Sequence, residues 1–398
     1  MKTIIRLLTV SVLISALFCS CTNESNQRAK YVFLFIGDGM GNTHVAAAES
    51  YLSYKAGKLG GEQLEFTKFP VFGTATSHSA SHQVTCSSAS GTAIACGEKA
   101  NNGTVGINKD SVEIQSVAYA LKDAGYKIGI MSSVPINHAT PSSFYAHNHS
   151  RGNCYELSLE IPQTGFDFFG GSGFLQFNGA NGDQEPTDAY LERNGYVVSY
   201  GIEEFKKESV GQDKMVFCQE SNRQESAANY VSGNEVAEDA SLAEMVDLAI
   251  NFLGDEKPFF IMCEGGAIDW EAHSNKTMTM VNEVLEFNKA IQTAYEFYLK
   301  HKNETLIVVT ADHETGGITL GSAGYINWEK FENQWLESGK QNTLDKEENR
   351  KLNKECGISW TTGGHTGGAV PVYAIGKGAE KFAGRIDNTD IKGKILCE

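Results

Sequence analysis

Five short segments of the chain are almost continuously apolar, and we predict that each forms a buried strand. The first of them ends in the string Gly-Asp-Gly. Strands that are apolar on both faces are typical of a largely parallel sheet that is covered by helices. The segments are residues 31–36, 127–131, 259–263, 305–309 and 370–375.

Stretches with helical periodicity lie between these strands, at residues 43–55, 88–95, 114–124, 240–253 and 278–301. Such alternation of strands and helices predicts an α/β fold with a mostly parallel central sheet between helical layers. Two other segments, 152–236 and 321–362, have neither an apolar pattern of their own nor the composition of a linker. We interpret them as irregular insertions of a single large domain, near the mouth of its site.

Acidic residues follow three of the predicted strands. Asp38, Glu264 and Asp312 each come directly after an apolar run or within three residues of its end. Parallel strands bring their carboxyl ends to one edge of the sheet, where α/β proteins bind ligands. One such acid is usually a turn residue or a helix cap. Three of them, with histidines nearby in the sequence, predict a shared site.

The composition of the chain limits the kinds of partner that we expect it to recognise. The chain has 398 residues, of which 41% are hydrophobic and 21% charged, so it can bury a sizeable core. Its formal net charge of −16 argues against recognition of nucleic acid or of an anionic membrane as its main role. A small anionic substrate stays open, because bound metal ions can override the global charge locally.

The N-terminus has the pattern of a targeting signal. Lys2 and Arg6 precede an apolar stretch at 7–18, which is too short for a comfortable membrane span. Ser20 and Cys21 then resemble the cleavage site of a lipoprotein. An ordinary secretory signal that is cut nearby is the alternative.

We therefore expect residues 1–20 to be a signal peptide, residues 21–30 a polar tether and residues 31–398 the folded domain. A lipidated Cys21 would place the protein outside the cytoplasm, in the periplasm or attached to the outer membrane. The seven cysteines after Cys21 are irregularly spaced and contain no C-x-x-C pair. We interpret most of them as small buried apolar residues and not as zinc ligands.

Ser87 lies in a run of small residues that starts a predicted helix. Backbone N–H groups at a helix start favour an anion, although a plain N-cap serine is the commonest role at such a place. Further along, Pro141 predicts a helix start with Thr140 as its cap. Arg151 follows, and its planar fork is suited to bind two phosphate oxygens.

Four further residues combine carboxylate and imidazole. Asp269 and His273 are four positions apart, so on a helix both face one metal ion. His313 directly follows Asp312 at the end of a strand, and His365 lies in a glycine-rich loop. Carboxylate with imidazole suits zinc, whereas sites made only of oxygen suit magnesium.

Together these strings resemble the alkaline phosphatase family over most of the chain: residues 37–41 (GDGMG), 84–93 (VTCSSASGTA), 264–273 (EGGAIDWEAH), 310–313 (TADH) and 364–368 (GHTGG). The resemblance implies hydrolysis of phosphate monoesters through a phosphoserine on Ser87, with Arg151 binding the phosphate. It also implies two zinc ions and one magnesium ion. Their ligands would be Asp269, His273 and His365 for the first zinc; Asp38, Asp312, His313 and Ser87 for the second; and Asp38, Thr140 and Glu264 for magnesium.

Three positions depart from the pattern of many bacterial members. Cys86 replaces an aspartate that helps to hold the substrate arginine, which puts the rigidity of Arg151 in doubt. His138 replaces another aspartate, and we expect it behind the magnesium ligands. Trp270 stands where other members carry lysine or histidine, and we expect it to flank the phosphate by packing.

Two other functions stay open from the sequence. Phosphodiesterases and sulfatases of the same superfamily share the metal core, but Arg151 with the magnesium set favours monoesters. A surface-binding lipoprotein with structural metals is a non-enzymatic alternative, and the complete ligand set disfavours it. The resemblance also leaves a homodimer open.

Overall fold

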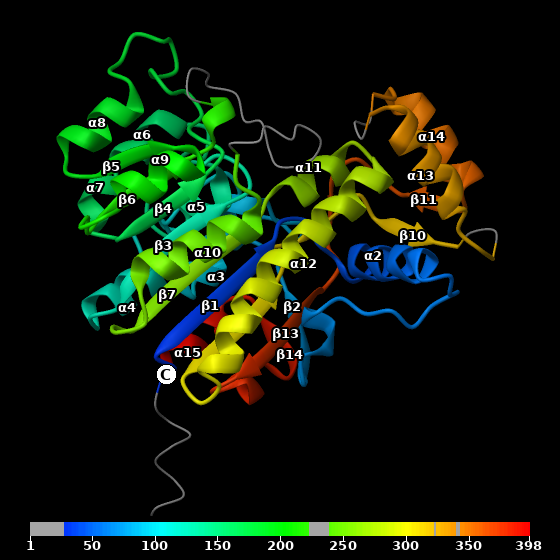
Figure 1. Ribbon diagram of the computed structural model, residues 1–398, viewed down its shortest axis with the longest axis horizontal. Helices are drawn as coiled ribbons and strands as arrows, with labels where there is room; N and C mark the ends of the chain where they lie inside the picture. The colour runs from blue at the N-terminus through cyan, green and yellow to red at the C-terminus, as the bar shows by residue number, and fades with distance from the viewer. Residues whose placement is uncertain (1–27, 223–238, 322–323, 340–342) are drawn as a thin grey trace, which may run out of the picture.

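A ten-stranded sheet forms the centre of the computed structural model (Figure 1). The structure describes residues 28–222, 239–321, 324–339 and 343–398. Neighbouring strands are parallel except β13, which runs antiparallel to both of its neighbours. The order is β14 (Gly384–Asp387), β2 (Val71–Thr76), β13 (Val370–Gly376), β8 (Thr305–Thr310), β1 (Tyr31–Gly37), β7 (Phe259–Gly265), β3 (Lys127–Ser132), β4 (Phe168–Gly171), β6 (Met215–Cys218) and β5 (Val197–Tyr200).

The five predicted strands are confirmed, and they are consecutive neighbours in this sheet: β13, β8, β1, β7 and β3. The central strand β1 is buried at every position. Tyr31 pairs with Phe259 on one side and with Thr305 on the other. This shared register brings the carboxyl ends of β8, β1 and β7 to the same level.

The five predicted helices are also confirmed: α2 (Asn42–Lys55), α3 (Ser87–Cys96), α4 (Val117–Asp123), α10 (Leu242–Leu253) and α12 (Thr277–Lys300). Helix α10 begins at a capping box, in which the Ser241 hydroxyl and the Glu244 carboxylate satisfy each other's backbone N–H groups. Helix α12 contacts α10 and α2 on one face of the sheet, and α15 (Asp390–Leu396) contacts α3 and α4 (Figure 1).

The prediction of irregular structure was wrong for residues 152–222. This segment supplies β4, β6 and β5, which extend one end of the central sheet. Each of these strands has only four residues, which is too short for a periodic pattern to be recognised. Helices α6 (Cys154–Leu159) and α7 (Ile161–Thr164) precede β4, α8 (Thr187–Arg193) connects β4 to β5, and α9 (Gly201–Glu208) connects β5 to β6.

The second predicted insertion forms a small helical unit beside α2 (Figure 1). It contains α13 (Trp328–Glu337), α14 (Lys346–Glu355) and a two-stranded sheet of β10 (Ile318–Leu320) and β11 (Ile358–Trp360). Trp328 anchors it, because its ring is buried 5.4 Å from that of Tyr51 and its Nε1 donates to Ser50 Oγ at 3.0 Å. Aromatic burial thus joins this unit to the main domain.

The predicted signal peptide, Cys21 and most of the predicted tether lie outside the described residues. At the end of the predicted tether, Arg28 Nε donates to the carbonyl of Leu396 at 2.8 Å, and Ala29 is buried. Among the described helices, none is both long and apolar enough to cross a membrane. Of the seven cysteines after Cys21, none forms a disulfide and five are buried, which confirms their interpretation as small core residues.

Candidate active site

Asp38, Asp312 and His313 form a buried group at the carboxyl edge of β1 and β8. All three side chains are fully buried. His313 Nε2 lies 3.4 Å from Asp38 Oδ1 and 3.1 Å from Asp312 Oδ2. The other oxygen of Asp312 accepts the backbone N–H groups of Gly39 and His313, at 3.0 and 2.8 Å. These bonds fix the carboxylate so that its free oxygen faces the site.

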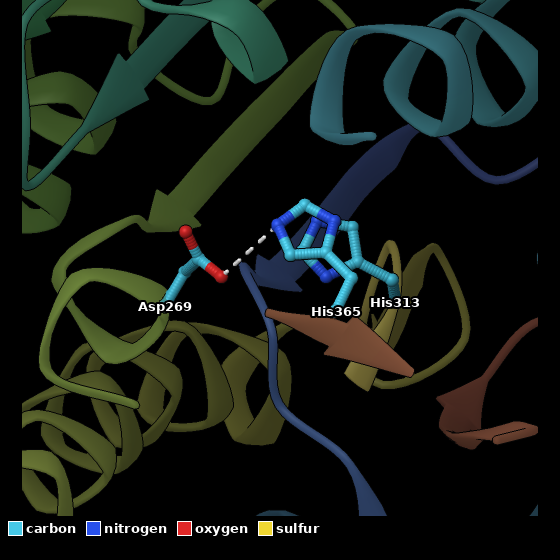
Figure 2. Close-up of side chains that lie close together, drawn as sticks. All are labelled: Asp269, His313 and His365. Atoms are coloured by element: carbon cyan, nitrogen blue, oxygen red, sulfur yellow. Dashed lines mark ion pairs between the residues drawn. The ribbon is translucent and has the colours of Figure 1, made fainter. Parts of the chain in front are cut away.

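Helix α11 (Ala267–His273) brings Asp269 to the same place. Figure 2 shows its carboxylate pointing toward the stacked rings of His313 and His365, whose centroids lie 3.6 Å apart. His365 belongs to the two-stranded sheet of β12 (His365–Thr366) and β9 (Glu314–Thr315). Asp269, His313 and His365 can each offer one ligand atom within 4.8 Å of the others, as can Asp38, Asp312 and His313.

His273 and His365 are oriented as metal ligands are. Their Nδ1 atoms lie 2.7 and 2.8 Å from the carbonyl oxygens of Gly363 and Thr85, so each Nδ1 carries the proton. Both Nε2 atoms then present lone pairs, and they lie 3.2 Å apart. Nε2 of His273 is also 3.2 Å from Asp269 Oδ2. Two imidazole lone pairs and a carboxylate that converge in this way are typical of a zinc site.

Glu264, Asp38 and His138 form a third group with ligand atoms within 4.8 Å of one another. Glu264 lies within β7 and not beyond its end. One of its oxygens accepts from the hydroxyl of Ser132, the last residue of β3. Burial raises the pKa of Glu264 to about 7.

Thr140 joins this third group through its hydroxyl, which lies 3.5 Å from Asp38 Oδ2. The predicted cap role of Thr140 was wrong. Helix α5 (Ala139–Ser142) begins one residue earlier, and His138 is its N-cap. Thr140 is therefore in the first turn, fully buried, with its side chain directed at a carboxylate.

Ser87 is placed beside the second group. It is the first residue of α3, with Cys86 as the N-cap, and it is 2% exposed. Its Oγ lies 3.2 Å from Nε2 of His313. The hydroxyl therefore faces the metal group and does not cap the helix.

Arg151 is held by two contacts that the sequence did not reveal. Its Nη2 donates to His138 Nε2 at 3.2 Å, and its backbone N–H donates to the carbonyl of Gly103 at 2.7 Å. Burial and the charge of Arg151 lower the pKa of His138 to about 3, so the imidazole is neutral and can accept this bond. A histidine thus supports the arginine from the side.

Cys86 supports the same arginine indirectly. Its Sγ accepts a hydrogen bond from the backbone N–H of Gly103 at 3.1 Å. The carbonyl oxygen of Gly103 accepts one from the backbone N–H of Arg151. The thiol therefore fixes the loop on which the arginine leans. Trp270 packs edge-on against His138, with ring centroids 5.6 Å apart.

The electrostatics of the site favour bound cations. Four carboxylates, those of Asp38, Glu264, Asp269 and Asp312, are at most 4% exposed. Three carboxylate oxygens here have no hydrogen-bond partner among the described residues: Asp38 Oδ1, Glu264 Oε1 and Asp312 Oδ2. Buried acceptors of this kind are normally satisfied, and buried like charges repel. Divalent metal ions would satisfy the acceptors and neutralise the charges, so the donor set fits such ions.

The sequence model described as alkaline phosphatase matches residues 29–170, 225–343 and 323–397. The chain belongs to the alkaline phosphatase family. It is 30% identical to alkaline phosphatase 4 of Bacillus subtilis (strain 168), over 96% of this chain and 93% of that protein. The family consists of enzymes that hydrolyse phosphate monoesters, and the chain is therefore a hydrolase of this class.

Solved alkaline phosphatases have the same fold. The enzyme of the Antarctic bacterium TAB5 is 31% identical, with a TM-score of 0.75 over 93% of this chain and 97% of that chain. A variant of that enzyme, in which a histidine is replaced by glutamate, has magnesium bound in its M3 site; it is 30% identical, with a TM-score of 0.76 over the same shares. The expected large domain with a mostly parallel central sheet is thereby confirmed.

Two residues of the site were missed in the sequence. Ser132 ends an apolar strand next to β7, so its position at the same sheet edge could have been noticed. Thr315, two residues after His313, has its hydroxyl 2.5 Å from Asp269 Oδ1 and 3.2 Å from His313 Nδ1. Nothing in the local sequence marks it, because both contacts depend on how the loop after β8 folds back.

Proposed function

We propose that this alkaline phosphatase transfers the phosphoryl group of a monoester first to Ser87 and then to water. The observation that carries the proposal is the position of the Ser87 hydroxyl, 3.2 Å from Nε2 of His313 at the first turn of α3. The same nitrogen faces the carboxylates of Asp38 and Asp312. A hydroxyl beside such a group is suited to act as an activated nucleophile.

Two zinc ions and one magnesium ion suit the donor atoms of the three groups. When bound, these ions supply Lewis-acid chemistry that lowers the pKa of a hydroxyl and stabilises developing negative charge. The magnesium in the TAB5 variant supports the assignment of the third group. The proposed ligands are Asp269, His273 and His365 for the first zinc; Asp38, Asp312, His313 and Ser87 for the second; and Asp38, Thr140 and Glu264 for magnesium.

In the first step the Ser87 hydroxyl gives up its proton and its oxygen attacks phosphorus, the bond to the ester oxygen breaks, and that oxygen takes up a proton and leaves as the alcohol. In the second step the oxygen of water attacks phosphorus, the bond to Ser87 breaks, the Ser87 oxygen regains a proton from the water, and inorganic phosphate leaves. Arg151 holds two non-bridging oxygens throughout, because its guanidinium can donate two parallel N–H bonds. His138 keeps that guanidinium in place, and Trp270 closes the side of the phosphate site by packing on His138.

Replacement of Ser87 tests the proposal. Ser87→Ala should abolish the covalent phosphoprotein and lower kcat on the order of 10³-fold or more. Ser88→Ala is the matched control, since the Ser88 hydroxyl lies 3.3 Å from Cys86 Sγ and not at the metal groups. Acid quenching with labelled substrate, followed by peptide mapping, would locate the label. Label on Ser88 or Thr85 would disprove the assignment.

A comparison of substrates tests the reaction class. An aryl phosphate monoester should be hydrolysed in preference to a bis-aryl diester, because a monoester leaves more negative oxygens for Arg151 and the cations. Preference for the diester would favour the phosphodiesterase alternative. No turnover of either by protein loaded with zinc and magnesium would favour a binding protein.

We also propose that the protein is an extracytoplasmic lipoprotein attached through Cys21. The support is the order of Lys2 and Arg6, the apolar stretch 7–18 and the pair Ser20-Cys21. More than one acyl chain is needed for stable anchoring, and a lipidated N-terminal cysteine supplies it. Cys21→Ser should release active enzyme from the membrane fraction with unchanged kinetics. Recovery of the wild type as soluble protein with an unmodified N-terminus would contradict this.

A further inference from the structure

We propose that Thr315 is a positioning residue that links the two zinc groups and selects the tautomer of His313. This inference rests on the proposed function, since it concerns how the metal ligands are held. Thr315 is fully buried in β9, and its hydroxyl lies between Asp269 and His313. These two residues come from different elements and belong to different proposed zinc sites.

The single proton of the hydroxyl decides the arrangement. An ionised carboxylate can only accept a hydrogen bond, so Thr315 Oγ1 donates its proton to Asp269 Oδ1 at 2.5 Å. The oxygen then has lone pairs left for His313 Nδ1, which lies 3.2 Å away. His313 Nδ1 must therefore carry the proton of the neutral ring.

This tautomer leaves Nε2 of His313 with its lone pair exposed to the site. Nε2 is the atom that lies 3.2 Å from Ser87 Oγ and 3.4 Å from Asp38 Oδ1. With the opposite tautomer, an N–H group would point at the place where the second zinc is expected. Metal-binding histidines are commonly fixed in this way by a partner on the other ring nitrogen.

The backbone holds the Thr315 hydroxyl in place. Its N–H donates to the carbonyl of Gly39 at 3.0 Å, and β9 pairs Thr315 with His365 of the first group. A Cβ on Gly39 would lie 2.8 Å from Thr315 Oγ1 and 2.9 Å from Asp269 Oδ1. The turn after β1 thus leaves room for this hydroxyl, and Thr315 contacts all three residues that are drawn in Figure 2, through its hydroxyl or its strand pairing.

Three variants test the role. Thr315→Val removes the hydroxyl at almost constant volume, Thr315→Ser restores it, and Thr310→Val is the control. Thr310 is also fully buried, but its hydroxyl donates to the carbonyl of Pro371 at 3.0 Å and touches none of the proposed ligands. Each full-length protein would be loaded with zinc and titrated with a chromophoric chelator to obtain zinc stoichiometry and affinity.

Thr315→Val should bind zinc about 10- to 100-fold more weakly than the wild type, as expected for loss of a hydrogen bond to metal ligands. Thr315→Ser should stay within a few-fold of the wild type, and so should Thr310→Val. Thermal unfolding of the metal-free proteins separates a positioning role of Thr315 from a structural one. Replacement of a merely structural threonine would lower stability without selectively lowering zinc affinity.

Tight binding of two zinc ions by Thr315→Val, or equal losses in all three variants, would overturn the inference. These outcomes leave the proposed function intact, provided that the wild type binds two zinc ions and forms the phosphoserine on Ser87. A wild type that binds no zinc would overturn both.

Discussion

In the metal-free protein, the contribution of Glu264 to stability is expected to fall as the pH rises from about 4.5 to about 7. Burial raises the pKa of Glu264 from 4.5 to about 7. Between these values the native state keeps a proton that the unfolded state has released. The contribution of Glu264 to the free energy of unfolding therefore decreases with rising pH in this window. Burial also raises the pKa of Asp38, which adds an effect of the same sign.

The size of the effect follows from the two pKa values. A difference between 4.5 and about 7 corresponds to about 3 kcal/mol for Glu264. Asp269 and Asp312 have pKa values below the ordinary range, because contacts with histidines outweigh burial. Their contribution is lost only in acid, below about pH 4. The pKa of His138 is lowered by burial, so His138 acts in the opposite direction in this window. Urea unfolding of metal-stripped wild type and metal-stripped Glu264→Gln at pH 5 and pH 7.5 would isolate the effect of Glu264.

Two controls make this prediction refutable. Glu264→Gln cannot ionise, so the change in stability between the two pH values should differ between this variant and the wild type by up to about 3 kcal/mol. Loading with zinc and magnesium should reverse the contribution of Glu264, because the cations favour the ionised carboxylates. The same change in stability with pH in metal-stripped wild type and metal-stripped Glu264→Gln would refute the reasoning about this carboxyl group.

Three further predictions concern the phosphate site and the turn after β1. Arg151→Ala should weaken inhibition by inorganic phosphate about 10- to 100-fold and change diester turnover less. Equal losses of monoester and diester turnover would indicate a structural role for Arg151. His138→Leu should weaken the same inhibition about 10-fold by freeing the guanidinium, and an unchanged inhibition constant would contradict the contact. Gly39→Ala should lose zinc in the chelator titration, because Gly39 has φ +72° and its Cβ would meet Asp269; full zinc content would contradict it.

The centre of the fold was predictable because its strands are buried on both faces. A run such as β1 contains only apolar side chains before its terminal glycine, so the sequence carries a direct signal. The outer strands lack that signal. Strand β2 alternates between buried and partly exposed positions, and β4, β5 and β6 have four residues each. Their assignment depends on neighbours that are far away in the sequence.

The candidate site was predictable as a set of residues but not as a set of contacts. The motifs named every residue that the three metal groups bring together except His138, which was expected behind the magnesium ligands. They did not reveal that His138 supports Arg151, or that Cys86 does so through Gly103. Such contacts depend on side-chain orientation, and hydrogen-bond partners leave no periodic trace in the sequence. The structure therefore shows which of the predicted site residues contact one another.

The acidic surface and the anionic substrate can be reconciled by the local charge of the site. The whole chain carries a formal charge of −16, which opposes the approach of a phosphate dianion. The four buried carboxylates would worsen this repulsion if they were alone. Three divalent cations would bring six positive charges against four negative ones, and Arg151 would add another. On this reasoning the neutral His138 matters, because it holds the arginine without adding negative charge beside the phosphate.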